Sequence, residues 1–137
     1  MIEMTSYSIP AYCDGQLVTL QQVLGLVDSQ ILRWQLTELE GITAPGCGLD
    51  SVELESAARS TPGGLPFSNQ ALAALADQLL QVINCELFGY RVQGADRTEA
   101  AVVVIRAMDS SEWSIVVDAS SIAVNDSSPL LQFSGGE

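Results

Sequence analysis

The chain has 137 residues, of which 47% are hydrophobic and 16% charged, a composition typical of one folded domain and not of a disordered acidic tail. Acidic residues outnumber basic ones, 17 to 5, which gives a formal net charge of −12. The sequence contains neither lysine nor histidine. These absences exclude imidazole bases, imidazole metal ligands and lysine Schiff bases, and the net charge disfavours nucleic acid and anionic membranes as partners.

The sequence predicts a cytoplasmic protein. Its first residues, MIEMTSYSIP, lack the basic and apolar regions of a secretory signal, and no stretch reaches the roughly 18 apolar residues of a membrane-spanning helix. The three cysteines (Cys13, Cys47 and Cys85) are an odd number with no CxxC pair, which is typical of a chain kept in a reducing compartment.

The first element with clear signals is a helix that begins at Leu20. Thr19 can cap this helix while the side chain of Gln22 reaches back to the cap, and apolar residues then recur at helical spacing. The segment before the helix, residues 6–18, fits either a short hairpin around Asp14 or an irregular arm.

Residues 18–36, VTLQQVLGLVDSQILRWQL, resemble a helix-turn-helix, and the LRW within them is similar to the second helix of the MerR-type regulators. A recognition helix presents several basic or amide side chains to DNA, whereas the second helix of this segment would offer Arg33 and two glutamines and is followed by Glu38 and Glu40. We therefore expect no residue of this segment to contact DNA as the MerR-type regulators do. One bent helix, two short helices and a strand over residues 31–40 all fit the pattern.

Two further helices are predicted between residues 50 and 84. Asp50 caps the first of them, which ends near Arg59. Ser68 caps the second, and apolar residues at helical spacing extend that helix to about Asn84.

From Leu87 the apolar period changes to two, which is the period of a strand. The stretch LFGYRV alternates and places Phe88 and Tyr90 on one side, and EAAVVVIRAM is a continuous apolar run typical of a central strand covered on both faces. After the turn DSSE, the stretch WSIVVDA predicts a partner strand, and residues 130–133 predict an edge strand.

These elements predict a single α+β domain over residues 1–137. In this fold an antiparallel meander of three to four strands from the C-terminal half packs against about three helices from the N-terminal half. The chain from about residue 126 is expected to form a loose tail.

Cys47, in the loop APGCG, is the one candidate for catalytic chemistry. Its glycine neighbours leave the thiol accessible, and a helix that starts just after it can lower the pKa of the thiol. Against this, a nucleophilic cysteine is activated by histidine, lysine or arginine, and two of these are missing from the chain. No spacing of side chains indicates a metal site or a nucleotide, so we expect no metal and no cofactor.

Six residues are candidates for partner binding, because tryptophan and arginine most often anchor interfaces and because a proline-bounded loop presents apolar side chains. They are Arg33, Trp34, Leu65, Phe67, Arg106 and Trp113. The alternative that we weigh equally places the tryptophans in the core and the arginines in salt bridges on the sheet.

The sequence therefore favours a non-catalytic acidic protein-binding module, such as a small adaptor, escort or regulatory protein, that binds a basic partner and forms a homo-oligomer, in the simplest case a homodimer. The alternative is a small-molecule-binding or thiol-dependent enzyme domain centred on Cys47, and the third hypothesis is an acidic mimic of nucleic acid. A deep pocket with convergent polar groups would favour the enzyme, and a flat apolar patch would favour the binding module.

Overall fold

The computed structural model describes residues 4–13, 15–27, 32–46, 48, 50–91, 101–109, 111–119, 122, 124 and 125. The elements in chain order are β1 (Met4–Pro10), β2 (Tyr12–Cys13), β3 (Gln16–Leu17), α1 (Leu20–Leu24), β4 (Leu32–Thr43), α2 (Ser51–Ser60), β5 (Leu65–Ser68), α3 (Asn69–Asp77), β6 (Leu79–Arg91), β7 (Val103–Met108) and β8 (Glu112–Asp118). The predicted tail from residue 126 and the predicted strand at residues 130–133 lie outside the described residues.

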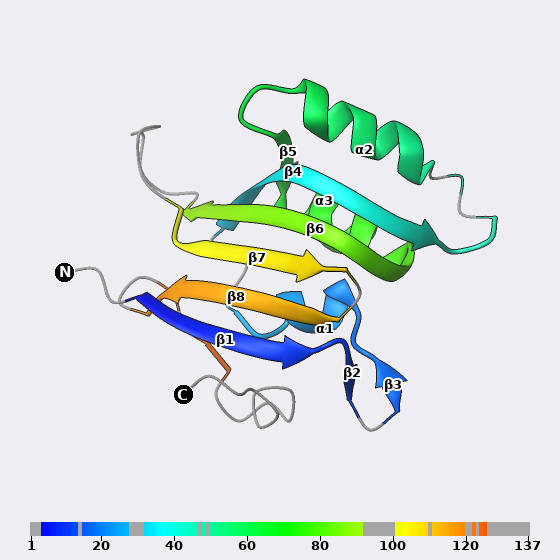
Figure 1. Cartoon of the computed structure of the whole chain (residues 1–137). Helices are drawn as coiled ribbons and strands as arrows, with labels where there is room; N and C mark the ends of the chain where they lie inside the picture. The colour runs from blue at the N-terminus through cyan, green and yellow to red at the C-terminus, as the bar shows by residue number, and fades with distance from the viewer. Residues whose placement is uncertain are drawn as a thin grey trace.

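A single six-stranded sheet dominates the fold (Figure 1). Its strand order is β1-β8-β7-β6-β4-β5, and every neighbouring pair is antiparallel. Strands β2 and β3 form a separate small hairpin. The predicted fold class, a three- to four-stranded meander packed against about three N-terminal helices, is therefore wrong, because β1, β4 and β5 come from the first half of the chain and the helices are short.

The segment that resembles a helix-turn-helix contains a helix of only five residues, α1, followed by the long strand β4. In β4 the side chains of Leu32, Trp34 and Leu36 are buried and those between them are half-buried, which is the period of a strand. The MerR-like resemblance is thus contradicted. Of the alternatives for residues 31–40, the strand is the correct one from Leu32 onward.

The prediction of the third helix is correct at its start and wrong at its end. Ser68 caps α3 as expected, but the helix ends at Asp77 and the chain re-enters the sheet at Leu79. The apolar residues that follow fit a helix or a strand equally well, and the continuous pairing of β6 with β4 selects the strand.

Other local signals are confirmed. The capping box of Thr19 with Gln22 is formed at α1, and the Asp50 carboxylate caps α2. Strands β6, β7 and β8 form the predicted consecutive antiparallel set. Of the hairpin and the irregular arm predicted for residues 6–18, the short hairpin is confirmed by the pairing of β2 with β3, whereas β1 was not predicted as a strand of the main sheet and pairs along its whole length with β8.

The core lies between one face of the sheet and the helices α1 and α3, which Figure 1 shows behind the sheet. On that face, side chains of directly paired residues form apolar rows that cross all six strands. One row consists of Tyr7, Ile115, Ile105, Leu87, Leu36 and Leu65, and the next consists of Thr5, Val117, Val103, Gly89, Trp34 and Phe67.

Helix α2 lies alongside the second half of β4, beyond the end of the short strand β5 (Figure 1). Ala58 is its buried residue, and Leu54 packs against the core. Within the described ranges no helix has the length and the apolar character needed to cross a membrane.

The contact between Trp34 and Gly89 fixes the centre of the core. The two residues are paired across β4 and β6, and the indole ring lies so close to Gly89 that a Cβ atom there would be 2.9 Å from Trp34 Cζ3. Trp34 is fully buried, and its Nε1 has no hydrogen-bond acceptor among the described residues, so packing alone accounts for its position there.

Replacing Gly89 by Ala should lower the free energy of unfolding by about 1–3 kcal/mol, because the new methyl group overlaps the indole ring of Trp34. Gly25→Ala is the matched control, since Gly25 has a helical φ of −70° and its Cβ would stand 3.4 Å from the nearest atom. Urea denaturation of both variants measures the difference, and equal stability of the two would contradict this account of the core.

Candidate functional site: the open face of the sheet

The face of β1, β8, β7, β6 and β4 that points away from α1 and α3 is not covered by any helix of the described part of the chain (Figure 1). We call it the open face. Its side chains alternate with the buried ones along each strand, and they are those of Ser6, Arg33, Gln35, Thr37, Glu86, Phe88, Tyr90, Val104, Arg106, Ser114 and Val116. The prediction that the β7 stretch is covered on both faces is wrong, because Val104 and Arg106 are half-buried where Val103 and Ile105 are buried.

An apolar row forms the centre of the open face. Phe88, Val104 and Val116 lie on three neighbouring strands and are directly opposite one another in the register. Ser6 and Gln35 extend the row to either side. The three side chains of the row are half-buried and form an apolar strip across the three strands.

A polar row runs beside this strip, with Glu86 at its centre. The Thr37 hydroxyl donates to Glu86 Oε1 at 2.6 Å, and Arg106 Nε donates to Glu86 Oε2 at 2.8 Å. The side chain of Glu86 is 28% exposed and that of Arg106 is 42% exposed, so this ion pair is reachable from solvent.

The hydrogen bond from Thr37, together with the hydrogen bond and the charge of Arg106, lowers the pKa of Glu86 below its ordinary value, against the opposing effect of partial burial. Glu86 is therefore ionised at neutral pH. A carboxylate with a lowered pKa is a weak base, so Glu86 is better suited to binding a cation than to abstracting a proton.

Two arginines stack on aromatic rings of the same face. The guanidinium carbon of Arg33 lies 4.8 Å from the centre of the Tyr90 ring, and that of Arg106 lies 5.9 Å from the centre of the Phe88 ring. Such contacts hold the long arginine side chains in one orientation and pre-organise them for contact with another surface.

Further acidic groups border the open face. Asn84 donates to Glu40 at 2.8 Å and accepts from the backbone N–H of Asp109, which has a positive φ of 52° in the turn after β7. On β8, Glu112 accepts from the Ser8 hydroxyl at 3.4 Å. Glu40 on β4 and Glu112 on β8 thus lie toward the same end of their strands, past Glu86.

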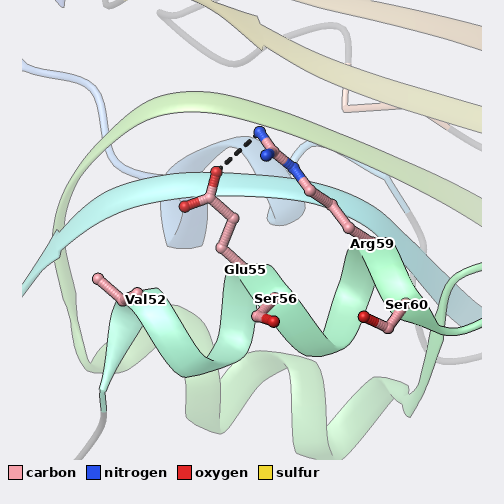
Figure 2. A pocket seen from close by; sticks show the side chains of 5 residues that line it. All are labelled: Val52, Glu55, Ser56, Arg59 and Ser60. Carbon is pink, nitrogen blue, oxygen red and sulfur yellow. Dashed lines mark ion pairs between the residues drawn. The ribbon is translucent and has the colours of Figure 1, made fainter.

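A hollow of about 270 Å³ lies on α2 (Figure 2). It is lined by Val52, Glu55, Ser56, Arg59 and Ser60, which all belong to one face of that helix. Glu55 and Arg59 form an ion pair of 2.9 Å along the helix. With one helix as its lining, the hollow lacks the convergent polar groups that a small-molecule site requires.

The predicted site residues are divided between three places. Arg33 and Arg106 lie on the open face, whereas Trp34 and Trp113 are core residues, as in the equally weighted alternative. Leu65 and Phe67 belong to β5 and pack against the core from the edge of the sheet.

Cys47 lies outside the described residues. The buried Cys85 has its pKa raised far above the ordinary value by burial and by the nearby charges of Glu38 and Glu86, so its thiol is inert at neutral pH. Within the described ranges no three Cys, Asp or Glu side chains come together as a metal-binding group.

The sequence-based prediction missed Thr37, Glu86, Phe88, Tyr90 and Val104 as surface residues. The alternation in LFGYRV did place Phe88 and Tyr90 on one side of a strand. The alternation does not indicate which side of the strand the helices cover, so it could not place these two residues on the surface.

Comparison of the chain with protein families, with curated proteins and with solved structures finds no match. The function is therefore argued from the site alone.

Replacing Thr37 by Val removes the shorter of the two side-chain hydrogen bonds to Glu86 and should raise the pKa of Glu86 toward its ordinary value. A lowered carboxyl pKa stabilises the folded state above the unfolded pKa, and that contribution is lost as the pH falls through the folded pKa. The Thr37→Val variant should therefore be less stable than the wild type near neutral pH, and the difference should shrink in acid.

A ¹³C NMR titration of the Glu86 carboxyl measures the first effect, and chemical denaturation at several pH values measures the second. Thr43→Val, the same change further along β4, is the matched control and should leave the Glu86 titration unchanged. An unchanged Glu86 titration in Thr37→Val would show that the hydroxyl does not hold the carboxylate.

Proposed function

We propose that this protein is a non-catalytic binding module that binds a basic partner protein through the open face of its sheet. The observation that supports the proposal is the in-register row of Phe88, Val104 and Val116 on a face bordered by two arginine–aromatic pairs. Protein interfaces are typically built in this way, with an apolar centre, aromatic and arginine anchors, and a polar rim.

The acidic groups of the open face support a basic partner. Glu86 lies beside the apolar row and is held ionised by its hydrogen bonds, and Glu40 and Glu112 lie further along the strands, past Glu86. The whole chain carries a formal net charge of −12. A field of this sign attracts a positively charged surface and speeds its encounter with the open face.

The chemistry of the chain supports binding over turnover. Its sequence has no histidine and no lysine, and Glu86 on the open face is a weak base. We also propose a cytoplasmic location. The three cysteines are an odd number with no CxxC pair, and a reducing compartment keeps such cysteines as thiols.

Val104→Arg tests the proposal, because it places a bulky cation in the middle of the apolar strip, where it opposes a basic partner. Val52→Arg is the matched control, since Val52 is 71% exposed on α2 and away from the sheet face. We expect the wild type and Val52→Arg to retain the same partner in affinity purification from source cells, and Val104→Arg to lose it.

Circular dichroism of both variants checks that the fold is retained. If Val104→Arg retains the partner, or if only Val52→Arg loses it, then the open face is not the binding surface.

Raising the ionic strength should weaken the same complex, since exposed charges farther apart than about 8–10 Å are screened at physiological salt. Titration calorimetry of the purified pair at low and at high salt measures this effect. An affinity that does not change with salt would contradict the charge complementarity on which the choice of a basic partner rests.

A further inference from the structure

Strand β1 forms one end of the sheet, and its sequence is unusual for an edge strand. Its seven residues, MTSYSIP, include no charged side chain in a chain of net charge −12. Its register with β8 runs from Met4 to Pro10 without a bulge. Edge strands are normally protected against further pairing by charges, prolines, bulges or short length.

The opposite edge of the sheet has these protections. Strand β5 has four residues and contains Pro66, and helix α2 lies along β4 where β5 ends. In β1 the one protecting residue is Pro10, at the last position of the strand. The two ends of the sheet therefore differ in their capacity to add another strand.

The hydrogen bonds of β1 show which backbone groups face outward. Ala11 donates its N–H to Ser111 at 3.1 Å, so the odd-numbered residues of β1 are directed toward β8. The N–H and C=O groups of Met4 and Ser6 then point to the outer edge. Within the described part of the chain, no strand pairs with that outer edge.

Tyr7 ends the apolar row on the core face of the sheet. It is half-buried and packs against the core through Ile115, and the row continues from there to Leu65 on the far strand. A further strand beside β1 would cover the outer side of the Tyr7 ring and extend this row.

We propose that β1 pairs antiparallel with β1 of a second copy of this chain about a two-fold axis at Tyr7, which joins the two sheets into one. The sequence is suited to this pairing because residues of like kind meet: Tyr7 faces Tyr7 of the partner subunit, Thr5 faces a second β-branched residue, and Ser6 faces a serine. The tyrosines occupy a non-hydrogen-bonded position, where side chains approach most closely.

A second copy is favoured over another partner because the pairing is self-complementary and because β1 is the edge at which two strongly acidic chains can approach without like charges directly opposite each other. The pairing uses the outer backbone edge of β1, whereas the test of the proposed function changes Val104 on β7, so either proposal can fail while the other stands.

Ser6→Glu tests the pairing, since it places two carboxylates diagonally across the two-fold axis. Ser56→Glu is the matched control: it is the same substitution of an exposed serine, with the same added charge, on α2. Sedimentation equilibrium over a wide range of concentrations should show a dimer for the wild type and for Ser56→Glu. For Ser6→Glu the dissociation constant should rise by about tenfold or more.

Ser6→Pro is a second, uncharged test. It removes an outward N–H and leaves the bonds between β1 and β8 in place, so it should weaken the dimer with little change in the melting temperature of the monomer. A wild type that is monomeric at every concentration would overturn the proposal. A dimer that survives both Ser6 variants, or that Ser56→Glu also abolishes, would overturn it equally.

Discussion

The antiparallel pairing of β4 with β6 is the constraint on which the other features of this protein depend. The two strands have 12 and 13 residues, and their register brings Trp34 over Gly89 on one face and Thr37 next to Glu86 on the other. Because side chains alternate along a strand, a slip of one residue would exchange the two faces, and the apolar rows would then face solvent. The close approach of Gly41 to the Gln81 carbonyl, where a Cβ atom would be 2.7 Å from the oxygen, adds a second point at which the register allows only glycine.

The two faces of the sheet differ in character because, among the described residues, the helices cover only one of them. The covered face contains the large aliphatic and aromatic side chains that stabilise the fold, and burial of this area is the main favourable contribution to stability. The open face contains an apolar strip and arginines held by aromatic rings and by a carboxylate. A surface of this kind suits recognition, because its polar groups are already oriented before a partner arrives.

Local sequence signals predicted local structure well. The caps at Thr19, Asp50 and Ser68 could be predicted because capping acts within three or four residues of the chain, and the strands beyond Leu87 were predicted from the alternation of LFGYRV and the apolar run of EAAVVVIRAM. The errors occurred where one pattern fits two structures. Residues 79–84 have the apolar spacing of a helix that continues α3, yet they form a strand because β4 offers a long partner edge. Strand β1 was missed as a sheet member because its partner, β8, is more than a hundred residues away in the sequence.

The sequence by itself determined which chemical groups the protein has: an acidic surface, arginine as the sole basic side chain, and no imidazole or ammonium group. It also determined where helices begin, since that depends on neighbouring residues. Only the tertiary structure decided that Arg33 and Arg106 share a face with Phe88 and Glu86 while Trp34 and Trp113 are buried. The physical reason is that the alternation of a strand defines two faces but does not say which one the helices will cover, and contacts between distant segments make that choice.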